Sequence, residues 1–91
     1  MAVVHVTPNL HRHVPESARP ARISGDTVRA VLSAYFLEIP ALRGYLLEDD
    51  GAVRKHMTVF VDGEAIRDRR QLTDPVSEDA EVFIMQALSG G

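Results

Sequence analysis

The sequence predicts an α+β fold in which a mixed sheet of four to five strands packs on one main helix. Three observations lead to this prediction: β-type runs near both ends of the chain, one central stretch with helical periodicity, and a two-residue hairpin signal after the strongest strand. With 91 residues, the chain has the size of one domain with one core. Its net charge is −3. Hydrophobic residues at 45% and charged residues at 25% are typical of a folded protein and argue against wholesale disorder.

The first two elements are predicted to be strands joined as a hairpin. Valines dominate residues 2–7, and Pro8 helps to end this strand because it has no N–H to donate to a neighbour. Residues 10–17 are mostly polar and contain a proline, so we expect a long hairpin loop there. Residues 18–24 then return as a second strand, which Pro20 confines to an edge of the sheet or to a bulge.

The main helix is predicted from apolar side chains that recur three to four residues apart. They would share one face of the helix: Val28, Val31, Leu32, Tyr35 and Ile39. Asp26 or Thr27 can cap its start by accepting a backbone N–H. The helix should stop near Glu38, because Pro40 bars regular continuation. A second short turn should begin at this proline and end at Gly44.

Three more strands are predicted in the second half of the chain. Residues 57–61 form the strongest strand, and Asp62-Gly63 after it is typical of a tight hairpin turn with positive φ. Residues 65–66 continue as a short strand, residues 67–79 form a charged loop, and residues 80–86 form the last strand. This order of elements is that of the β-grasp, or ubiquitin-like, architecture, in which one helix covers one face of a mixed sheet.

Composition and charge exclude several classes of function. The chain has no cysteine, so it carries no disulfide, thiolate metal site or cysteine nucleophile. The negative net charge argues against nucleic-acid binding. No apolar run approaches the roughly 20 residues of a membrane span. No export signal is evident, so we expect a cytoplasmic protein. Residues 1–45 carry a net charge of +2 and residues 46–91 a net charge of −5. The acidic second half could attract a basic partner, or its charged side chains could simply belong to solvated loops.

No set of side chains indicates an active site or a metal site. His11 and His13 would share a face of an extended chain, but the further ligands that a metal needs are not evident. Asp26 and Glu38 are twelve residues apart, too far along the helix for an acid–base pair. The basic side chains of the charged loop are interpreted as solvated: Arg67, Arg69 and Arg70. We therefore predict no catalytic residue in this chain.

One face of the sheet should stay open, because the only long helix covers the other face. On the last strand, Val82 and Ile84 alternate with Phe83 and Met85, so both faces of this strand are apolar. The neighbouring strand turns Phe60 to the open face. We predict that Phe60, Phe83 and Met85 form a partner-docking patch; unremarkable surface and a homodimer contact are the alternatives.

The last five residues, 87–91, are predicted to be a flexible tail beyond the final strand. They include Leu88, Ser89 and the pair Gly90 and Gly91. Glycine has no Cβ, so its backbone can enter a narrow channel. When extended, the tail reaches roughly 15–18 Å. It could therefore deliver the carboxylate of Gly91 into the active site of another protein; a merely frayed end is the alternative.

Several segments spread over nearly the whole chain look like one known family. They are Thr27–Leu32, Pro40–Leu42, Val59–Glu64, Glu81–Ile84 and the terminal Gly-Gly pair. Together they resemble the ubiquitin-like sulfur carriers, a ThiS/MoaD-like family. It includes the thiamine carrier, the small subunit of molybdopterin synthase and a carrier of cysteine biosynthesis. The segment Ser24–Thr27 and the overall length look most like the cysteine-biosynthesis branch.

The resemblance implies that residues 1–91 form a single ubiquitin-like domain that is not an enzyme and binds no cofactor. A ubiquitin-activating-type adenylyltransferase would use ATP to adenylate the carboxylate of Gly91. A sulfur donor would then convert it to a thiocarboxylate. A sulfur-acceptor enzyme of cysteine, thiamine or molybdopterin biosynthesis would take the sulfide. Two alternatives stay open: a protein modifier joined through Gly91 to a lysine, and a β-grasp interaction module without carboxyl chemistry.

Overall fold

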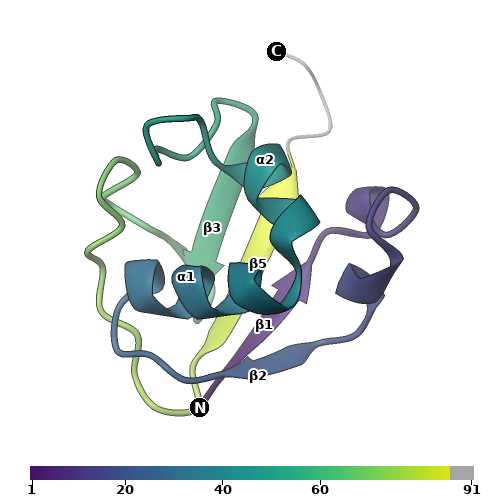
Figure 1. Ribbon diagram of the computed structural model, residues 1–91. Coiled ribbons are helices and arrows are strands. Elements are labelled where there is room, and N and C mark those ends of the chain that lie inside the picture. The colour runs from purple at the N-terminus through teal and green to yellow at the C-terminus, as the bar shows by residue number, and fades with distance from the viewer. Residues whose placement is uncertain (87–91) are drawn as a thin grey trace.

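A computed structural model, which describes residues 1–86, confirms the β-grasp architecture: a five-stranded sheet packs against one main helix (Figure 1). The strands are β1 Ala2–Val6, β2 Ala21–Ile23, β3 Met57–Val61, β4 Glu64–Ala65 and β5 Glu81–Gln86. The α-helices are α1 Val28–Glu38 and the short α2 Arg43–Leu46. Three 3₁₀ turns stand at Pro8–Leu10, Pro15–Ala18 and Pro40–Leu42. The predicted tail, residues 87–91, lies outside the described residues.

The order of strands across the sheet is β2-β1-β5-β3-β4, so β5 occupies its centre. β5 runs parallel to β1 and antiparallel to β3, with Val6 opposite Ile84 and Met57 opposite Gln86. The end of β1, the end of β5 and the start of β3 therefore meet at one end of the sheet. We call it the exit end, because the chain leaves β5 there.

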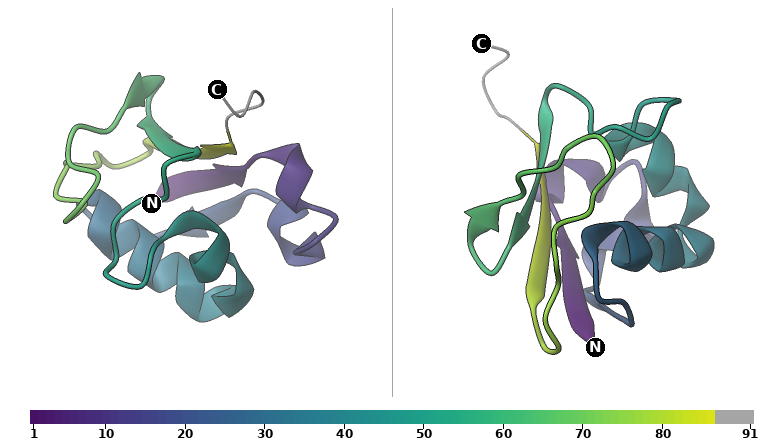
Figure 2. Two further views of the ribbon diagram at one scale, coloured as in Figure 1. Left: turned by 90° about the horizontal axis from the view of Figure 1, so that it is seen from above. Right: turned by 90° about the vertical axis from the view of Figure 1, so that its left-hand side faces the viewer.

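The core lies between the sheet and the helices. Figure 2 shows α1 and α2 on one side of the sheet, and no helix of residues 1–86 covers the other side of the strands. Along β5, Val82 and Ile84 are buried toward α1, while Phe83 and Met85 retain exposure on the other face. Of the two candidate caps, Thr27 caps α1: its hydroxyl accepts the N–H of Ala30 at 3.1 Å.

The predicted hairpin after β3 is confirmed. Asp62 and Gly63 have φ of +49° and +86°, the sign that a type I′ turn requires at both central positions. Val61 pairs with Glu64 in the antiparallel register that follows. The short strand is Glu64–Ala65 rather than 65–66, because Ile66 turns inward and is buried.

Several predicted boundaries were wrong, each because of a turn that forms near a proline or a buried side chain. The loop predicted over 10–17 holds 3₁₀ structure, and a second turn at Pro15–Ala18 shortens the predicted strand 18–24 to Ala21–Ile23. The second helical turn does not end at Gly44, because α2 continues to Leu46, whose side chain is buried in the core. The last strand begins one residue late, at Glu81, since Asp79 before it has a φ of +66°.

Candidate functional site

The exit end of the sheet is the candidate functional site, because the glycine pair follows from it in sequence. Gln86 shares a shallow hollow with residues of the segment after β1 and of α2: Asn9, Leu10, Arg12, His13 and Tyr45. The rings of His13 and Tyr45 stack with centroids 5.9 Å apart. On the other side of Gln86, its pairing with Met57 brings Lys55 and His56 to the same end.

Gln86 is held in position by its pairing with Met57 of β3, and the pairing of β5 with β1 on its other side reaches as far as Ile84. β5 pairs with β3 over five residue pairs and with β1 over four. Beyond β1, the buried Thr7 donates its backbone N–H to the carbonyl of Ile84 at 2.8 Å. A central strand paired on both sides loses its position only if the sheet opens. Gln86 therefore presents the rest of the chain from a fixed point.

The residues of the predicted patch lie on the face of the sheet away from α1. Phe60 stands opposite Phe83 in the register of β3 and β5, and Thr58 stands opposite Met85. Both phenylalanines are half-buried, and Met85 is 37% exposed. The alternation predicted from the sequence therefore places these three apolar side chains on the open face.

His5 of β1 belongs to the same face, as expected for a surface residue of a strand, but its contact with Phe83 was not predicted from the sequence. Its ring stacks on that of Phe83 with centroids 4.4 Å apart and an angle of 10° between the planes. Its Nε2 lies 2.6 Å from Oε1 of Glu81, which holds the imidazole over the phenylalanine. The only local signal was the alternation of His5 with buried Val4 and Val6, and nothing in it points to β5.

His11 and His13 do not share a face, because their segment is turned rather than extended. His11 follows the first 3₁₀ turn, and its Nε2 lies 2.9 Å from the carbonyl oxygen of Val6. His13 faces Tyr45 in the separate hollow at the exit end. Within residues 1–86, no three histidine or carboxylate side chains come together as metal ligands would.

Arg69 is a structural residue, so its interpretation as a solvated loop side chain was wrong. Its Nη2 donates to the carbonyl oxygens of Arg54 and Met57, both at 2.7 Å. Arg54 in turn donates to the carbonyl of Gly44 and pairs with Glu48 at 3.0 Å. These bonds tie the charged loop and α2 to the start of β3. They therefore brace the strand that pairs with Gln86.

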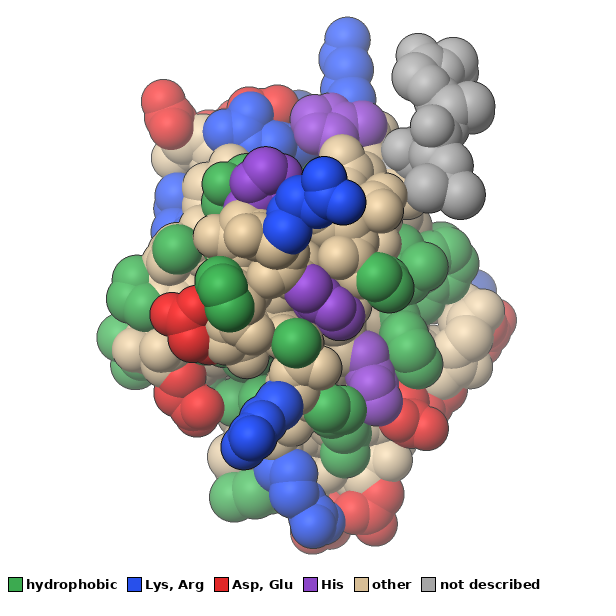
Figure 3. Space-filling model, turned by 90° about the vertical axis from the view of Figure 1, so that its right-hand side faces the viewer, with side chains coloured by type: hydrophobic (Ala, Val, Ile, Leu, Met, Phe, Trp, Pro, Cys, Tyr) green, Lys and Arg blue, Asp and Glu red, His purple; other side chains and the backbone are tan. Residues whose placement is uncertain are grey.

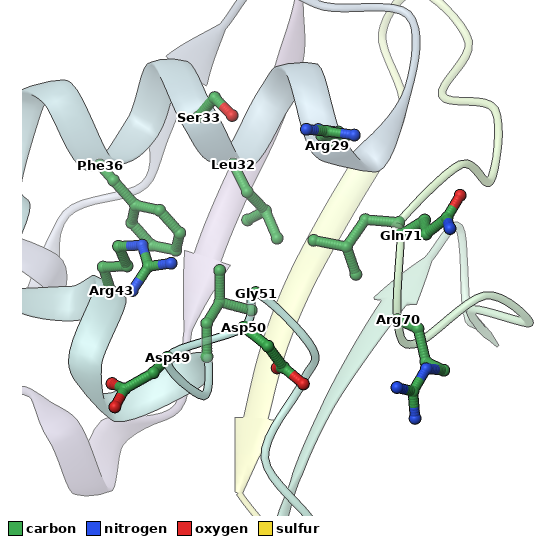
Figure 4. A pocket seen from close by; sticks show the side chains of 12 residues that line it. Arg29, Leu32, Ser33, Phe36, Arg43, Asp49, Asp50, Gly51, Arg70 and Gln71 are labelled. Carbon is green, nitrogen blue, oxygen red and sulfur yellow. The ribbon is translucent and has the colours of Figure 1, made fainter.

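A groove on the helix side of the molecule is lined by α1, the loop after α2 and the charged loop (Figure 4). Leu32 and Phe36 point into it from α1, and charged side chains of both signs surround it. These charged side chains are Arg29, Arg43, Asp49, Asp50 and Arg70. Charges of both signs around an apolar floor suit a protein contact better than a reacting centre, which needs converging acid and base groups.

The two largest pKa shifts have structural causes away from the exit end. The pKa of Asp68 falls to about 2, because its carboxylate accepts the backbone N–H of Gln71 and the hydroxyl of Thr73. Burial raises the pKa of Tyr35 to about 12, and the nearby Glu38 adds to the shift. Neither group lines a cavity with a second acid or base, so neither indicates catalysis.

A family comparison decides what kind of protein this is. The model of the ThiS family matches residues 14–91, which is most of the chain. The chain belongs to the ThiS family. Proteins of the ThiS family are carriers and not catalysts. Across residues 1–86 of this member, no helix is long and apolar enough to span a bilayer.

Solved structures agree with the fold. CysO in the Amycolatopsis orientalis BexX/CysO complex has a TM-score of 0.82 at 19% identity, and the match covers 100% of both chains. CysO of Mycobacterium tuberculosis has a TM-score of 0.81 at 21% identity, covering 97% of this chain and 100% of that one. SAMP1 of Haloferax volcanii has a TM-score of 0.77 at 25% identity, covering 99% and 98%. No curated protein sequence matches significantly.

Proposed function

We propose that this ThiS-family chain is a sulfur carrier whose reacting group is the carboxylate of Gly91. The observation that carries the proposal is the family match, which runs through the Gly90-Gly91 pair. A carrier needs a group that a partner enzyme can load. The sequence offers no thiol for this purpose, since it contains no cysteine, and a carboxylate requires none.

The proposed loading takes place on a ubiquitin-activating-type adenylyltransferase that uses ATP. A carboxylate oxygen of Gly91 attacks the α-phosphorus of ATP, pyrophosphate leaves, and an acyl-adenylate forms. A sulfur donor supplies a sulfide nucleophile that attacks the carbonyl carbon and displaces AMP, which leaves a thiocarboxylate. In the cytoplasm, an acceptor enzyme of cysteine, thiamine or molybdopterin biosynthesis takes the sulfur, and hydrolysis restores the carboxylate.

The fixed position of Gln86 supports delivery of this group at a distance. Five residues beyond it span roughly 15–18 Å when extended. Gly90 adds no side chain that would have to pass through a narrow channel. We propose that Leu88 and Ser89 lead the carboxylate of Gly91 to the nucleotide site of the partner, while the sheet remains outside it.

The open face of the sheet is the proposed docking surface for these partners. Phe60, Phe83 and Met85 supply apolar area there, and His5 extends it toward β1. CysO, which shares this fold, was solved in a complex with BexX. By that likeness we propose a stable contact between this chain and a biosynthetic acceptor enzyme.

The second candidate function is that of a protein modifier. SAMP1, a small archaeal modifier protein, covers 99% of this chain at 25% identity and supports this alternative. A modifier would use the same carboxylate, but an isopeptide bond to a lysine would replace the thiocarboxylate. The two functions therefore differ in the product and not in the activated group.

Intact-mass analysis of the protein purified with its native neighbouring genes tests both candidates. A carrier gains the mass difference of one oxygen replaced by sulfur, and the change maps to Gly91. A modifier instead appears covalently attached to lysines of other proteins. A protein that shows neither product in the presence of its activating enzyme and ATP is a β-grasp interaction module, and the proposal is then wrong.

A further inference from the structure

The open face of the sheet carries a row of side chains with opposite charges at its two ends. The members of this charged row are Arg22 of β2, Val3 of β1, Glu81 of β5 and Asp62 after β3. Strand pairing sets Arg22 opposite Val3 and Val3 opposite Glu81. Asp62 lies beside Glu81, whose backbone N–H it accepts at 2.9 Å. The row is therefore positive at the β2 edge of the sheet and negative toward β3.

The charges at the two ends of this row are available to another molecule. Arg22 and Asp62 are both exposed, and neither takes part in an ion pair within residues 1–86. Three strand spacings of about 4.8 Å separate Arg22 from Asp62 within one copy of the chain, which is too far for the two to pair.

A second row, two residues further along β1, is apolar. Phe60 of β3 lies opposite Phe83 of β5, and Phe83 lies opposite His5 of β1. Beyond His5, a hollow opens toward the segment that precedes β2, where Ala18 and Pro20 line it. In Figure 3, hydrophobic and histidine side chains lie next to one another on the side of the molecule that is shown. The apolar row therefore has an aromatic ring at its β3 end and a hollow at its β2 end.

Both rows are complementary to themselves about a two-fold axis that runs along the strands between β1 and β5. In the strand order β2-β1-β5-β3-β4, this rotation lays β1 over β5 and β2 over β3 of a second copy. Arg22 then lies over Asp62 and next to Glu81 of the second copy, and Phe60 lies over the hollow. Each contact occurs twice, which is the property of an isologous interface.

The twist of the sheets preserves this match. Sheets that pack face to face lie about 10 Å apart, with their strands about 30° from parallel. At the distance of β2 and β3 from the axis, roughly 7 Å, this angle displaces opposing residues by roughly one position along a strand. Arg22 carries its charge at the end of a long side chain and can follow this displacement. A two-fold axis across the strands would instead lay β2 over β2 and separate Arg22 from both acids.

We propose that a second copy of this chain covers the open face when no partner enzyme is bound there. A width of five strands and strands of five residues give this face an area of roughly 400 Å². That is about half of the roughly 800 Å² that each partner buries in a stable interface. The dimer is therefore weak, and a partner enzyme that binds the same face displaces the second copy.

This inference goes beyond the proposed function, because it concerns the chain before any partner binds. Since the axis runs along the strands, both exit ends lie at the same end of the dimer, outside the covered faces. The contact instead hides Phe60, Phe83 and Met85, which form the proposed docking surface. Self-association therefore lowers the concentration of chain that is ready to dock.

Sedimentation equilibrium of the full 91-residue chain without any partner tests the proposal. We expect a monomer–dimer equilibrium between about 10 μM and 1 mM. Met85→Asp places a carboxylate of each copy in the contact and should leave a monomer throughout this range. Leu37→Asp makes the same kind of change on α1, where Leu37 is 85% exposed, and should match the wild type. Melting curves establish that both variants fold.

A double-mutant cycle of Arg22→Gln and Asp62→Asn tests the predicted register. Asparagine tolerates the φ of +49° at Asp62, so the hairpin turn is kept. Each single change removes an exposed ion pair twice and should weaken the dimer about 2- to 30-fold. The double variant should be no weaker than Arg22→Gln alone, because the two side chains act on each other. Arg29→Gln, which changes an arginine of the groove on the helix side, is the matched control and should have no effect.

Three results would overturn the inference. The first is a wild type that stays monomeric up to about 1 mM. The second is a dimer that Leu37→Asp dissociates and Met85→Asp does not, because its contact lies on the helix side. The third is simple addition of the effects of Arg22→Gln and Asp62→Asn, which means that the two side chains do not meet. None of these results concerns loading of Gly91, so the proposed function stands or falls separately in the intact-mass experiment.

Discussion

Replacing Tyr35 with phenylalanine should stabilise this protein, because the change removes a buried polar atom that the described structure leaves unpaired. Tyr35 is completely buried in the face of α1 that packs on the sheet. Among the side chains of residues 1–86, its hydroxyl oxygen is the buried polar atom without a hydrogen-bond partner. Phenylalanine keeps the ring and opens at most a small void.

The expected gain follows from the usual penalty for such a group. A buried donor or acceptor without a partner costs about 1–3 kcal/mol. After allowance for lost contacts of the oxygen, we expect the free energy of unfolding to rise by about 1–2 kcal/mol. In a domain of this size, each kcal/mol raises Tm by roughly 4–8 °C.

Alkaline pH gives a second test of the same group. Burial raises the pKa of Tyr35 to about 12, so above pH 10 the phenol ionises in the unfolded chain but not in the folded one. The unfolded state then binds fewer protons than the folded state, and the Tyr35 contribution to stability is lost as pH rises from 10 to 12. The slope is roughly 1 kcal/mol per pH unit. Tyr35→Phe should lack this loss.

Urea unfolding followed by circular dichroism measures both effects. Tyr45→Phe is the matched control, since Tyr45 is 40% exposed and its change should shift stability by no more than about 0.5 kcal/mol. If Tyr35→Phe instead lowers the free energy of unfolding by about 1 kcal/mol or more at neutral pH, the hydroxyl makes a stabilising bond and the reasoning is refuted.

Four further predictions concern Asp68 of the charged loop, the cap of α1, the patch and the tail. The lowered pKa of Asp68 means that its contribution to stability disappears as the pH falls from 4 to 2. An acid titration of Asp68→Asn should therefore show a smaller loss of stability over this range than that of the wild type. An equal loss in both proteins contradicts this prediction. Thr27→Ala should cost about 1 kcal/mol in urea melts by removing the cap of α1, and no change would mean that the cap is dispensable. Met85→Asp should weaken binding to the adenylyltransferase, as measured by calorimetry. The control Leu37→Asp changes a residue of α1 that is 85% exposed and should not weaken it. Equal effects of the two changes would argue against the patch. Deletion of Gly91 should leave the melting curve unchanged and abolish thiocarboxylate formation in intact-mass spectra, because the carboxylate moves back by about 3.3–3.6 Å. A truncated protein that is still loaded would refute the carrier proposal.

Elements with a local signal were predicted well. The apolar spacing of α1, its cap at Thr27 and the positive φ at Asp62 depend on residues close together in sequence. Elements whose ends depend on distant contacts were predicted less well. α2 passes Gly44 because Leu46 finds a place in the core, and no nearby residue indicates that it will.

The candidate site was only partly predictable for the same reason. The alternation on β5 was enough to place Phe83 on the open face, but its partner His5 is 78 residues away and is brought to it by strand pairing. Arg69 bonds to backbone carbonyls, which every residue has, so its sequence context contains no signal.

The central place of β5 also affects how the chain folds as it is synthesised. Of the strands described, β5 is the last to leave the ribosome, yet it joins the β1–β2 pair to the β3–β4 pair. Until residue 86 has emerged, the two pairs have no strand between them and the apolar face of α1 has no complete sheet to cover. The fold therefore closes late, through contacts between segments far apart in sequence, which slows folding. An activating enzyme that binds this sheet would therefore not bind chains whose synthesis is incomplete.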